Sequence, residues 1–336
     1  MFYIAEIGLN HNGDPQLARE MVDAAFQAGA DAVKFQSIRA DKLVSPQTFD
    51  TPIDGFGLKN VNNLGDFWNK VSIDKDFHIN IKNYCHEKGL EFMSTPFDFN
   101  NVDLLDDLGV KRFKIASGDL TNWPLIDYII NKNKPILLST GGATLEEVRD
   151  TVDFIKNRNS AVDLTLLHCV SLYPTPPDLA NLQALDELKT LHNGKVGFSD
   201  HTEGYHIPLA AIARGAEVIE KHFTIDQNLP GPDQKMSATP DIFSKIVKYG
   251  NQVRESIKLQ GKKLSQQEKG ELDDMRRSIV AARNLKAGTI LTKQDLDFKR
   301  PGTGISPRQF QKVLGKKLNQ SLQKDDQIKG SHLDDK

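Results

Sequence analysis

One strand–helix–strand unit opens the chain, and over residues 2–36 it reads FYIAEIGLNHNGDPQLAREMVDAAFQAGADAVKFQ. Residues 2–7 and 31–36 are short runs of apolar and β-branched side chains, which predict strands. Between them, residues 15–28 carry apolar side chains at helical spacing. Pro15 stands at the start of this segment and Gly29 just past its end, the residues expected at the two ends of a helix.

This unit repeats along most of the chain. Apolar runs recur about every 30 residues as far as Thr224, each followed by a segment of helical period. The predicted strands are residues 2–7, 31–36, 90–94, 112–116, 135–139, 163–168, 195–199 and 217–223. Alternating strands and helices predict an α/β fold with a parallel sheet, and eight pairs in about 250 residues fit a (β/α)8 TIM barrel better than an open doubly wound sheet. No G-x-G-x-x-G follows the first strand and no phosphate-loop lysine motif occurs, so nucleotide binding loses its main support.

The remaining chain is predicted to form a linker and a small second domain. After the barrel, residues 1–258, the sequence turns polar, and residues 259–276 are interpreted as a linker or an exposed helix. Residues 277–336 contain short apolar runs near 279–282 and 298–300, with turn residues at 287–288 and 301–302, which predicts a compact β-rich domain. A core of this size is marginal alone, so the domain is expected to dock on the barrel or on another subunit.

Composition and charge exclude several classes of protein. The 336 residues are 38% hydrophobic and 26% charged, as in ordinary soluble domains. No apolar run approaches the ~20 residues that span a bilayer, and no basic segment followed by an apolar one begins the chain, so neither a membrane nor a signal peptide is expected. Two cysteines, Cys85 and Cys169, predict buried thiols in a reducing cytoplasm.

The net charge of −2 is unevenly distributed. From Arg276 onward there are 14 Lys and Arg and 6 Asp and Glu, so this tail carries +8 and the rest of the chain −10. The tail lacks interleaved aromatic residues and zinc-finger spacing, so nucleic acid is not the expected partner. An acidic protein surface or an anionic substrate fits its charge better.

Polar residues collect at the carboxyl ends of all eight predicted strands, where a barrel of this kind has its active site. A single one of them would be interpreted as a helix cap or a satisfied core residue. Eight polar strand ends together are hard to assign to packing, because parallel barrel strands are otherwise apolar. In chain order they are Glu6, Lys34 and Gln36, Thr95, Lys114 with Ser117 and Asp119, Ser139, His168 with Ser171 and Tyr173, Ser199 with His201, and Glu220 with His222.

These residues predict two kinds of binding. Two cations and several hydroxyl donors suit a phosphate ester where no Gly-rich loop is present; they are Lys34, Lys114, Thr95, Ser117, Ser139 and Ser199. The alternative is that each lysine pairs with a nearby acid such as Glu6. His201 and His222, on neighbouring strands, could hold one divalent metal ion with open positions, for which Mn²⁺ is favoured and Mg²⁺ or Co²⁺ would substitute. Glu6 is the candidate base.

Nine motifs together resemble the sialic acid synthase family. They are EIGLNHNG (6–13), AVKFQ (32–36), STPF (94–97), FKIASG (113–118), LSTG (138–141), YPTP (173–176), FSDHT (198–202), IEKHFT (219–224) and PGPD (230–233). The tail, with KRPGTG (299–304), resembles the antifreeze-like (SAF) domain of those enzymes. The resemblance runs from residue 3 to about residue 328 with the motifs in the same order.

The resemblance implies an enzyme that condenses phosphoenolpyruvate with an N-acyl hexosamine and water to a nine-carbon acid and phosphate. It assigns phosphoenolpyruvate to the six residues named for the phosphate, the divalent metal to His201 and His222, and acid–base chemistry to Glu6. It places Gln36, Asp119, Tyr173, Asp233 and Arg300 at the sugar. It also implies a homodimer in which the tail domain swaps and lays Arg300 over the partner's active site.

Two departures from the neuraminate-type pattern bear on the acceptor. Asp119 stands where the family usually has Glu, and Ser171 where neuraminate synthases often have Asn. N-acetylmannosamine is the first expectation, and a diacetamido-hexose that gives a legionaminic- or pseudaminic-type product is the alternative. Two other readings stay open: a class I aldolase with Lys114 or Lys221 as Schiff-base lysine, and a carbohydrate- or ice-binding protein whose barrel is a scaffold.

Overall fold

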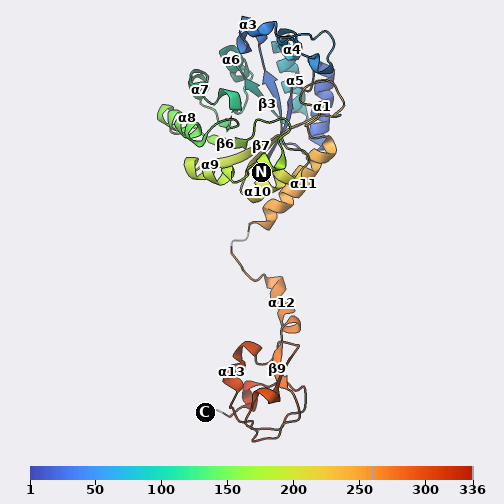
Figure 1. Ribbon diagram of the computed structural model, residues 1–336, viewed down its shortest axis with the longest axis vertical. Coiled ribbons are helices and arrows are strands. Elements are labelled where there is room, and N and C mark those ends of the chain that lie inside the picture. The colour runs from blue at the N-terminus through green and yellow to red at the C-terminus, as the bar shows by residue number, and fades with distance from the viewer. Residues whose placement is uncertain (259–260, 335–336) are drawn as a thin grey trace. The chain divides into compact units, whose positions relative to one another are not determined.

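Eight parallel strands form a nearly closed barrel in the computed structural model, which describes residues 1–258 and 261–334 (Figure 1). The strands are β1 (Phe2–Gly8), β2 (Ala32–Ser37), β3 (Glu91–Pro96), β4 (Phe113–Ile115), β5 (Ile136–Ser139), β6 (Leu164–Cys169), β7 (Lys195–Asp200) and β8 (Val218–His222). Their order in the sheet is β3-β2-β1-β8-β7-β6-β5-β4, and β3 and β4 lie side by side where the ring closes. The predicted TIM barrel is confirmed, and every observed strand overlaps its predicted range.

A helix follows each strand and covers the outside of the barrel (Figure 1). These are α1 (Pro15–Gln27), α5 (Lys75–Glu87), α6 (Phe99–Asp107), α7 (Trp123–Ile130), α8 (Leu145–Arg158), α9 (Ala184–His192), α10 (His206–Ala213) and α11 (Pro240–Ser256). In α1 the Asp14 side chain accepts hydrogen bonds from two backbone N–H groups of the first turn. Pro15 has no backbone N–H group, so it leaves no donor without a partner at this end of the helix. Gly29, at φ +86°, ends this segment in the left-handed region.

An insertion interrupts the even spacing between β2 and α5. It contains α2 (Ala40–Leu43), α3 (Pro46–Phe49), the 3₁₀ turn η1 (Gly55–Gly57) and α4 (Leu64–Val71). Its small core includes Ile38, Val61 and Phe67. The prediction of a strand about every 30 residues is wrong here, because loops at a barrel rim accept insertions without disturbing the strands.

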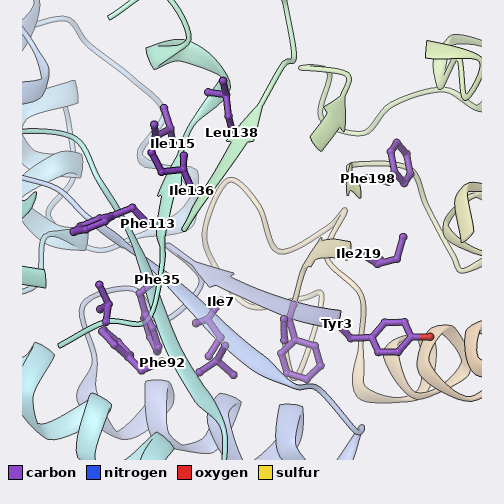
Figure 2. Packing of buried hydrophobic residues seen from close by; sticks show 14 of the residues in the cluster. Tyr3, Ile7, Phe35, Phe92, Phe113, Ile115, Ile136, Leu138, Phe198 and Ile219 are labelled. Atoms are coloured by element: carbon purple, nitrogen blue, oxygen red, sulfur yellow. The ribbon is translucent and has the colours of Figure 1, made fainter. Parts of the chain in front are cut away.

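Both faces of the barrel wall carry a layer of buried apolar side chains. Alternate residues of a strand face opposite sides, and one set packs under the helices. Figure 2 shows part of this set and labels residues of β1 to β5, β7 and β8. The other set closes the interior of the barrel with Ile4, Ala32, Met93, Leu137, Leu167 and Val218. Glu6 and Lys34 follow Ile4 and Ala32 by two residues, so they point into the barrel next to this layer.

A second compact unit takes up the chain after Lys258. Its strands β9 (Ser278–Ala281) and β10 (Leu296–Lys299) pair antiparallel. The unit also contains the helices α12 (Gln266–Met275) and α13 (Phe310–Val313) and the 3₁₀ turns η4 (Lys293–Asp295), η5 (Pro307–Gln309) and η6 (Gly330–His332). Nine buried apolar residues, among them Ile279 and Leu318, form its own core. The predicted β-rich fold is confirmed. Within the predicted linker, α12 is a capped helix without buried residues, whereas residues 259–260 of the linker and 335–336 of the tail lie outside the described residues.

Two smaller observations complete the fold. Both cysteines, Cys85 and Cys169, are buried free thiols, as the composition predicts. Among the helices that the structure describes, none combines the length and the apolar character needed to cross a bilayer.

Candidate active site

A cavity of about 240 Å³ opens among the carboxyl ends of the barrel strands. It brings together side chains from all eight strands and from the segments that follow β3, β4, β6 and β7. Of the predicted site residues, its lining includes Glu6, Lys34, Gln36, Thr95, Lys114, Ser117, Ser139, Ser171, Tyr173, Ser199, His201 and His222. The polar strand ends therefore do converge on one site, as the barrel prediction requires.

Glu6 and Lys34 form the centre of this lining because they are direct neighbours in the ladder between β1 and β2. Their Oε2 and Nζ atoms lie 2.7 Å apart, and Gln36 Nε2 donates to Glu6 Oε1 at 3.1 Å. The ladder shifts register between Glu6 and Gly8, and Gly8 has φ +53°. A Cβ at this glycine would lie 3.1 Å from Glu6 Oε1 and 3.3 Å from Gln36 Nε2, so its absence leaves room for that hydrogen bond.

Glu220 links the two lysines, a role that the sequence prediction missed. Its carboxylate lies 3.8 Å from Lys34 Nζ and 3.6 Å from Lys114 Nζ, and it accepts a hydrogen bond from Ser199 Oγ at 2.9 Å. Lys34 also donates to Thr95 Oγ1 at 3.0 Å. The position was readable in the sequence, because Glu220 stands two residues before His222 and so faces the same side of β8.

Burial and these contacts set the charge states. Burial raises the pKa of Glu6 to about 7, although Lys34 opposes the shift. For Lys34, burial disfavours the charge, but Glu220 and Glu6 outweigh it and raise the pKa of this ammonium. Burial lowers the pKa of Lys114 despite Glu220. The pKa of Glu220 is lowered, because the two lysines and Ser199 outweigh its burial. Lys34 thus pairs with Glu6, as the alternative reading held, and lines the cavity as well.

The hydroxyl groups of the cavity differ in how they are held. Ser117 Oγ accepts from the backbone N–H of Gly141 at 3.0 Å. A Cβ at Gly141 would lie 2.5 Å from Ser171 Oγ, so glycine permits this close approach. Ser139 Oγ is buried and has no hydrogen-bond partner in the described chain. A buried hydroxyl without a partner is uncommon and is suited to a ligand.

His201 and His222 face each other across neighbouring strand ends, with ring centroids 5.4 Å apart. His201 Nδ1 bonds Val170 O at 2.8 Å, so its Nε2 carries the lone pair, an arrangement typical of metal-binding histidines. His222 Nδ1 is buried without a hydrogen-bond partner, and Asp233 Oδ2 lies 3.5 Å from it. Burial lowers the pKa of both imidazoles, which favours the neutral, metal-binding form.

These two residues fit a divalent ion that keeps open positions. Within residues 1–258 and 261–334 no group of three or more His, Cys, Asp or Glu is arranged to hold a metal, so a closed structural site is not present in that part. Tyr173 packs against His201, with ring centroids 4.1 Å apart, and stays more than half exposed. It forms one side of the cavity entrance.

Two predicted site residues of the barrel unit, Asp119 and Asp233, are not part of the cavity lining. Asp119 lies in η2 (Ser117–Asp119), where it accepts from Asn122 Nδ2 at 3.0 Å and burial raises its pKa. Asp233 lies in the loop after β8 beside His222, and burial raises its pKa to about 6. Arg300 is an exposed residue of the second unit, directly after β10.

Lys221, one of the two candidate Schiff-base lysines, does not line the cavity either. Its Nζ lies 2.6 Å from Asp200 Oδ2 and also donates to Thr202 O. Both members of this ion pair are buried. Lys114 is therefore the one of the two candidates that reaches the cavity.

Comparison with known proteins agrees with this arrangement. An N,N'-diacetyllegionaminic acid synthase of Campylobacter jejuni is 39% identical over 327 residues, which cover 97% of this chain and 98% of that protein. The protein of the same name from Legionella pneumophila is 39% identical over 336 residues, 99% of this chain and 94% of the relative. A solved N-acetylneuraminic acid (sialic acid) synthetase from Leptospira borgpetersenii, in complex with citrate, is 34% identical with a TM-score of 0.70, covering 80% of this chain and 89% of that one.

Two regions of the chain match known families. Residues 276–334 match the SAF domain, which confirms the resemblance of the tail. Residues 21–263 match the NeuB family, and this match covers most of the barrel, with the strand ends of β2 to β8 that line the cavity. The chain therefore belongs to the NeuB family, as its resemblance to the sialic acid synthases predicts.

Proposed function

We propose that this protein condenses phosphoenolpyruvate with an N-acyl hexosamine and water, and releases phosphate and a nine-carbon nonulosonic acid. The observation that carries the proposal is the meeting of Lys34, Lys114 and the His201–His222 pair in one buried cavity. Two cations suit an enol phosphate, and two neutral imidazoles suit a Lewis acid beside it.

The lysines and the hydroxyl groups hold the phosphate ester. Lys34 and Lys114 approach Glu220 from two sides at 3.8 and 3.6 Å, so their ammonium groups are fixed before substrate arrives. Ser139 Oγ, buried and unpartnered, donates to a phosphate or carboxylate oxygen. Positive groups fixed in the cavity stabilise the charge that develops on the departing phosphate.

His201 and His222 hold a divalent cation, with Mn²⁺ favoured. Such an ion, when bound, supplies Lewis acidity toward the aldehyde oxygen of the open-chain sugar. His201 keeps the required tautomer through its Nδ1 contact with Val170 O, and the ring of Tyr173 shields the pair from one side.

Glu6 is the acid–base residue of the proposed reaction. The methylene carbon of phosphoenolpyruvate forms the new bond to the aldehyde carbon, the C=O π bond of the aldehyde breaks, and its oxygen takes the proton of the Glu6 carboxyl to become a hydroxyl group. Water then adds to the carbon that carries the phosphate. Glu6 Oε1 or Oε2 takes the proton of that water, and the C–O bond to phosphate then breaks, so that inorganic phosphate leaves. A pKa of about 7 places this carboxyl near the optimum for a base at neutral pH.

For the acceptor we propose a diacetamido-hexose that gives a legionaminic-type product, in place of N-acetylmannosamine. Two relatives at 39% identity carry the name N,N'-diacetyllegionaminic acid synthase, whereas the neuraminic acid synthetase of known structure is 34% identical. Ser171 supports this choice, because it lines the cavity and has a shorter side chain than the Asn that neuraminate synthases often have at this position.

The test is phosphate release by the full chain, stripped of metal and reloaded with Mn²⁺. Phosphoenolpyruvate is offered with N-acetylmannosamine, with a 2,4-diacetamido-hexose, or without acceptor, and the product is followed by mass spectrometry. Release should require an acceptor and be fastest with the diacetamido sugar. Release without acceptor, or none with any N-acyl hexosamine, contradicts the proposal. Borohydride trapping of a pyruvate adduct on Lys114 would instead favour the aldolase.

A homodimer in which Arg300 completes the site of the other protomer remains a prediction. The +8 charge of the tail suits a site that receives two anionic groups. Light scattering tests the dimer, and Arg300→Ala tests the residue. Turnover should fall while the dimer persists; an unchanged turnover would show that the tail arginine has no part in the reaction.

A further inference from the structure

A buried ion pair lies directly behind the two histidines. Asp200 and Lys221 are register neighbours in the ladder between β7 and β8, and each precedes one histidine, His201 or His222. Ser199 and Glu220, the neighbouring pair in that ladder, point into the cavity. Because side chains alternate along a strand, Asp200 and Lys221 point to the opposite side of the wall.

Lys221 holds the chain on both sides of His201. Its Nζ lies 2.6 Å from Asp200 Oδ2 and donates to the carbonyl of Thr202. The other carboxylate oxygen of Asp200 accepts the Thr202 N–H at 2.8 Å. Three contacts thus close a small ring around the backbone that carries His201, and the residue that closes it is bonded directly to His222.

The energetics of this pair point to a use beyond stability. The side chains of Lys221 and Asp200 are 1% and 0% exposed, so both charges have lost their hydration. A buried ion pair is often no more stabilising than apolar residues of the same volume, and its best-attested use is to fix one geometry. The geometry that the Asp200–Lys221 pair can fix is the distance between the imidazole rings of His201 and His222.

We propose that Asp200 and Lys221 are positioning residues that fix His201 and His222 at the spacing one divalent cation needs. Asp200 accepts the N–H of Thr202 and so fixes the backbone turn that orients His201. Lys221 binds Asp200 and the Thr202 carbonyl and so connects this turn to β8, which carries His222. The inference rests on the proposed metal site and adds to it the part of the chain that prepares the site before the ion arrives. Neither residue touches substrate or metal.

The experiment measures Mn²⁺ affinity and stability separately. The full chain, stripped with a chelator, is titrated with Mn²⁺ alone, and free Mn²⁺ is followed by its electron paramagnetic resonance signal. Thermal unfolding is followed by intrinsic fluorescence, because Trp68 and Trp123 both lie in the barrel unit. The variants are Lys221→Met, Asp200→Asn, the double variant Asp200→Leu/Lys221→Met, and the control Glu91→Gln.

The control removes a different ion pair, since Glu91 Oε1 lies 2.7 Å from Arg112 Nε at the start of β3, the end of the strand away from the cavity. It should lower the unfolding midpoint and leave the Mn²⁺ affinity unchanged. The single variants at the ion pair should lower the midpoint and raise the Mn²⁺ dissociation constant by about 10- to 100-fold, the usual effect of losing a group that orients a metal ligand.

The double variant decides between a positioning role and a structural one. Its apolar pair should recover much of the thermal midpoint, because no charge is left unpaired, while the Mn²⁺ affinity stays low. Recovery of affinity together with stability overturns the positioning role, as does a dissociation constant within about threefold of the parent in any folded variant at Asp200 or Lys221. If the parent protein binds no Mn²⁺, the proposed metal site is overturned and the inference with it. If the parent binds Mn²⁺, the variants test the positioning role alone.

Discussion

Replacing Glu220 with Gln should destabilise the barrel and strengthen its response to phosphoenolpyruvate. The carboxylate lies 3.8 Å from Lys34 Nζ and 3.6 Å from Lys114 Nζ. At an effective dielectric constant of about 20, each contact is worth about 4–5 kcal/mol of Coulomb energy. The amide oxygen of Gln can still accept from Ser199, so the change removes charge and keeps shape.

The expected loss of unfolding free energy is smaller than the sum of the two Coulomb energies. Removing the charge also relieves the desolvation of a buried carboxylate, which costs several kcal/mol. Breaking a buried pair by removing one partner typically leaves a loss of about 3–5 kcal/mol, and we expect a decrease of this size in the unfolding free energy. The cavity of the variant carries one positive charge more, so phosphoenolpyruvate should raise its unfolding midpoint by more than it raises that of the parent.

Urea unfolding followed by intrinsic fluorescence measures both effects, since both tryptophans report on the barrel unit. The matched control is Glu217→Gln, an exposed residue just before β8, for which a change within about 0.5 kcal/mol is expected. The charge argument would be refuted by a Glu220→Gln protein whose unfolding free energy lies within about 1 kcal/mol of that of the parent, well below the loss expected for a broken buried ion pair, and whose response to phosphoenolpyruvate equals that of the parent.

Three further changes test other parts of the molecule. Glu6→Gln should lower turnover by about 10²-fold or more and leave phosphoenolpyruvate binding nearly intact by calorimetry, because a base is lost but no phosphate contact; a near-normal rate removes the assignment. Phe113→Ala should lower the unfolding free energy by about 3–5 kcal/mol, since its side chain is fully buried, against a small effect for the half-exposed Phe26→Ala, both by urea unfolding. Asp295 is buried, but Thr292 and Arg283 outweigh burial and lower its pKa; its contribution is present above the unfolded pKa of about 3.9 and lost as pH falls through the lower folded value. Asp295→Asn should therefore weaken hydrogen-exchange protection of β9 at neutral pH and match the parent in acid; a deficit that persists in acid would contradict it.

The barrel and most of its site were predictable because both follow from local periodicity. Short apolar runs alternating with helical segments indicate strands and helices wherever they are long enough to show a period. Once the fold is a barrel, the carboxyl end of each strand is fixed, and residues such as Lys34, Lys114 and His222 must meet there. That step needs no knowledge of any contact.

The insertion after β2 could not be predicted in the same way. Its helices α2 and α3 have four residues each, which is about one turn and too short for a repeating apolar pattern. The insertion is held by its own contacts, with Phe67 and Val61 in a small core. Such a core becomes visible only when the chain is folded.

The role of Glu220 was missed for a different reason. Sequence analysis placed it at a strand end, yet its importance depends on Lys34 and Lys114, which stand on β2 and β4 far from β8 in the chain. Asp119 shows the converse: a motif places it at the site, and the structure turns its carboxylate toward Asn122 instead of the cavity. Distances between charges decide such roles, and a one-dimensional pattern does not contain them.

The same limit applies to the ends of β7 and β8, where the sequence alone does not show which polar side chains face the cavity. Ser199, Asp200 and His201 are consecutive polar residues, as are Glu220, Lys221 and His222, so the alternation that separates the two faces of a strand disappears from the sequence. In the structure the alternation persists: Asp200 and Lys221 face away from the cavity and neutralise each other, while the residues on either side line the cavity. An unbroken polar run at the end of a barrel strand is therefore consistent with a buried strand when the side chains that face away from the site find partners on the next strand.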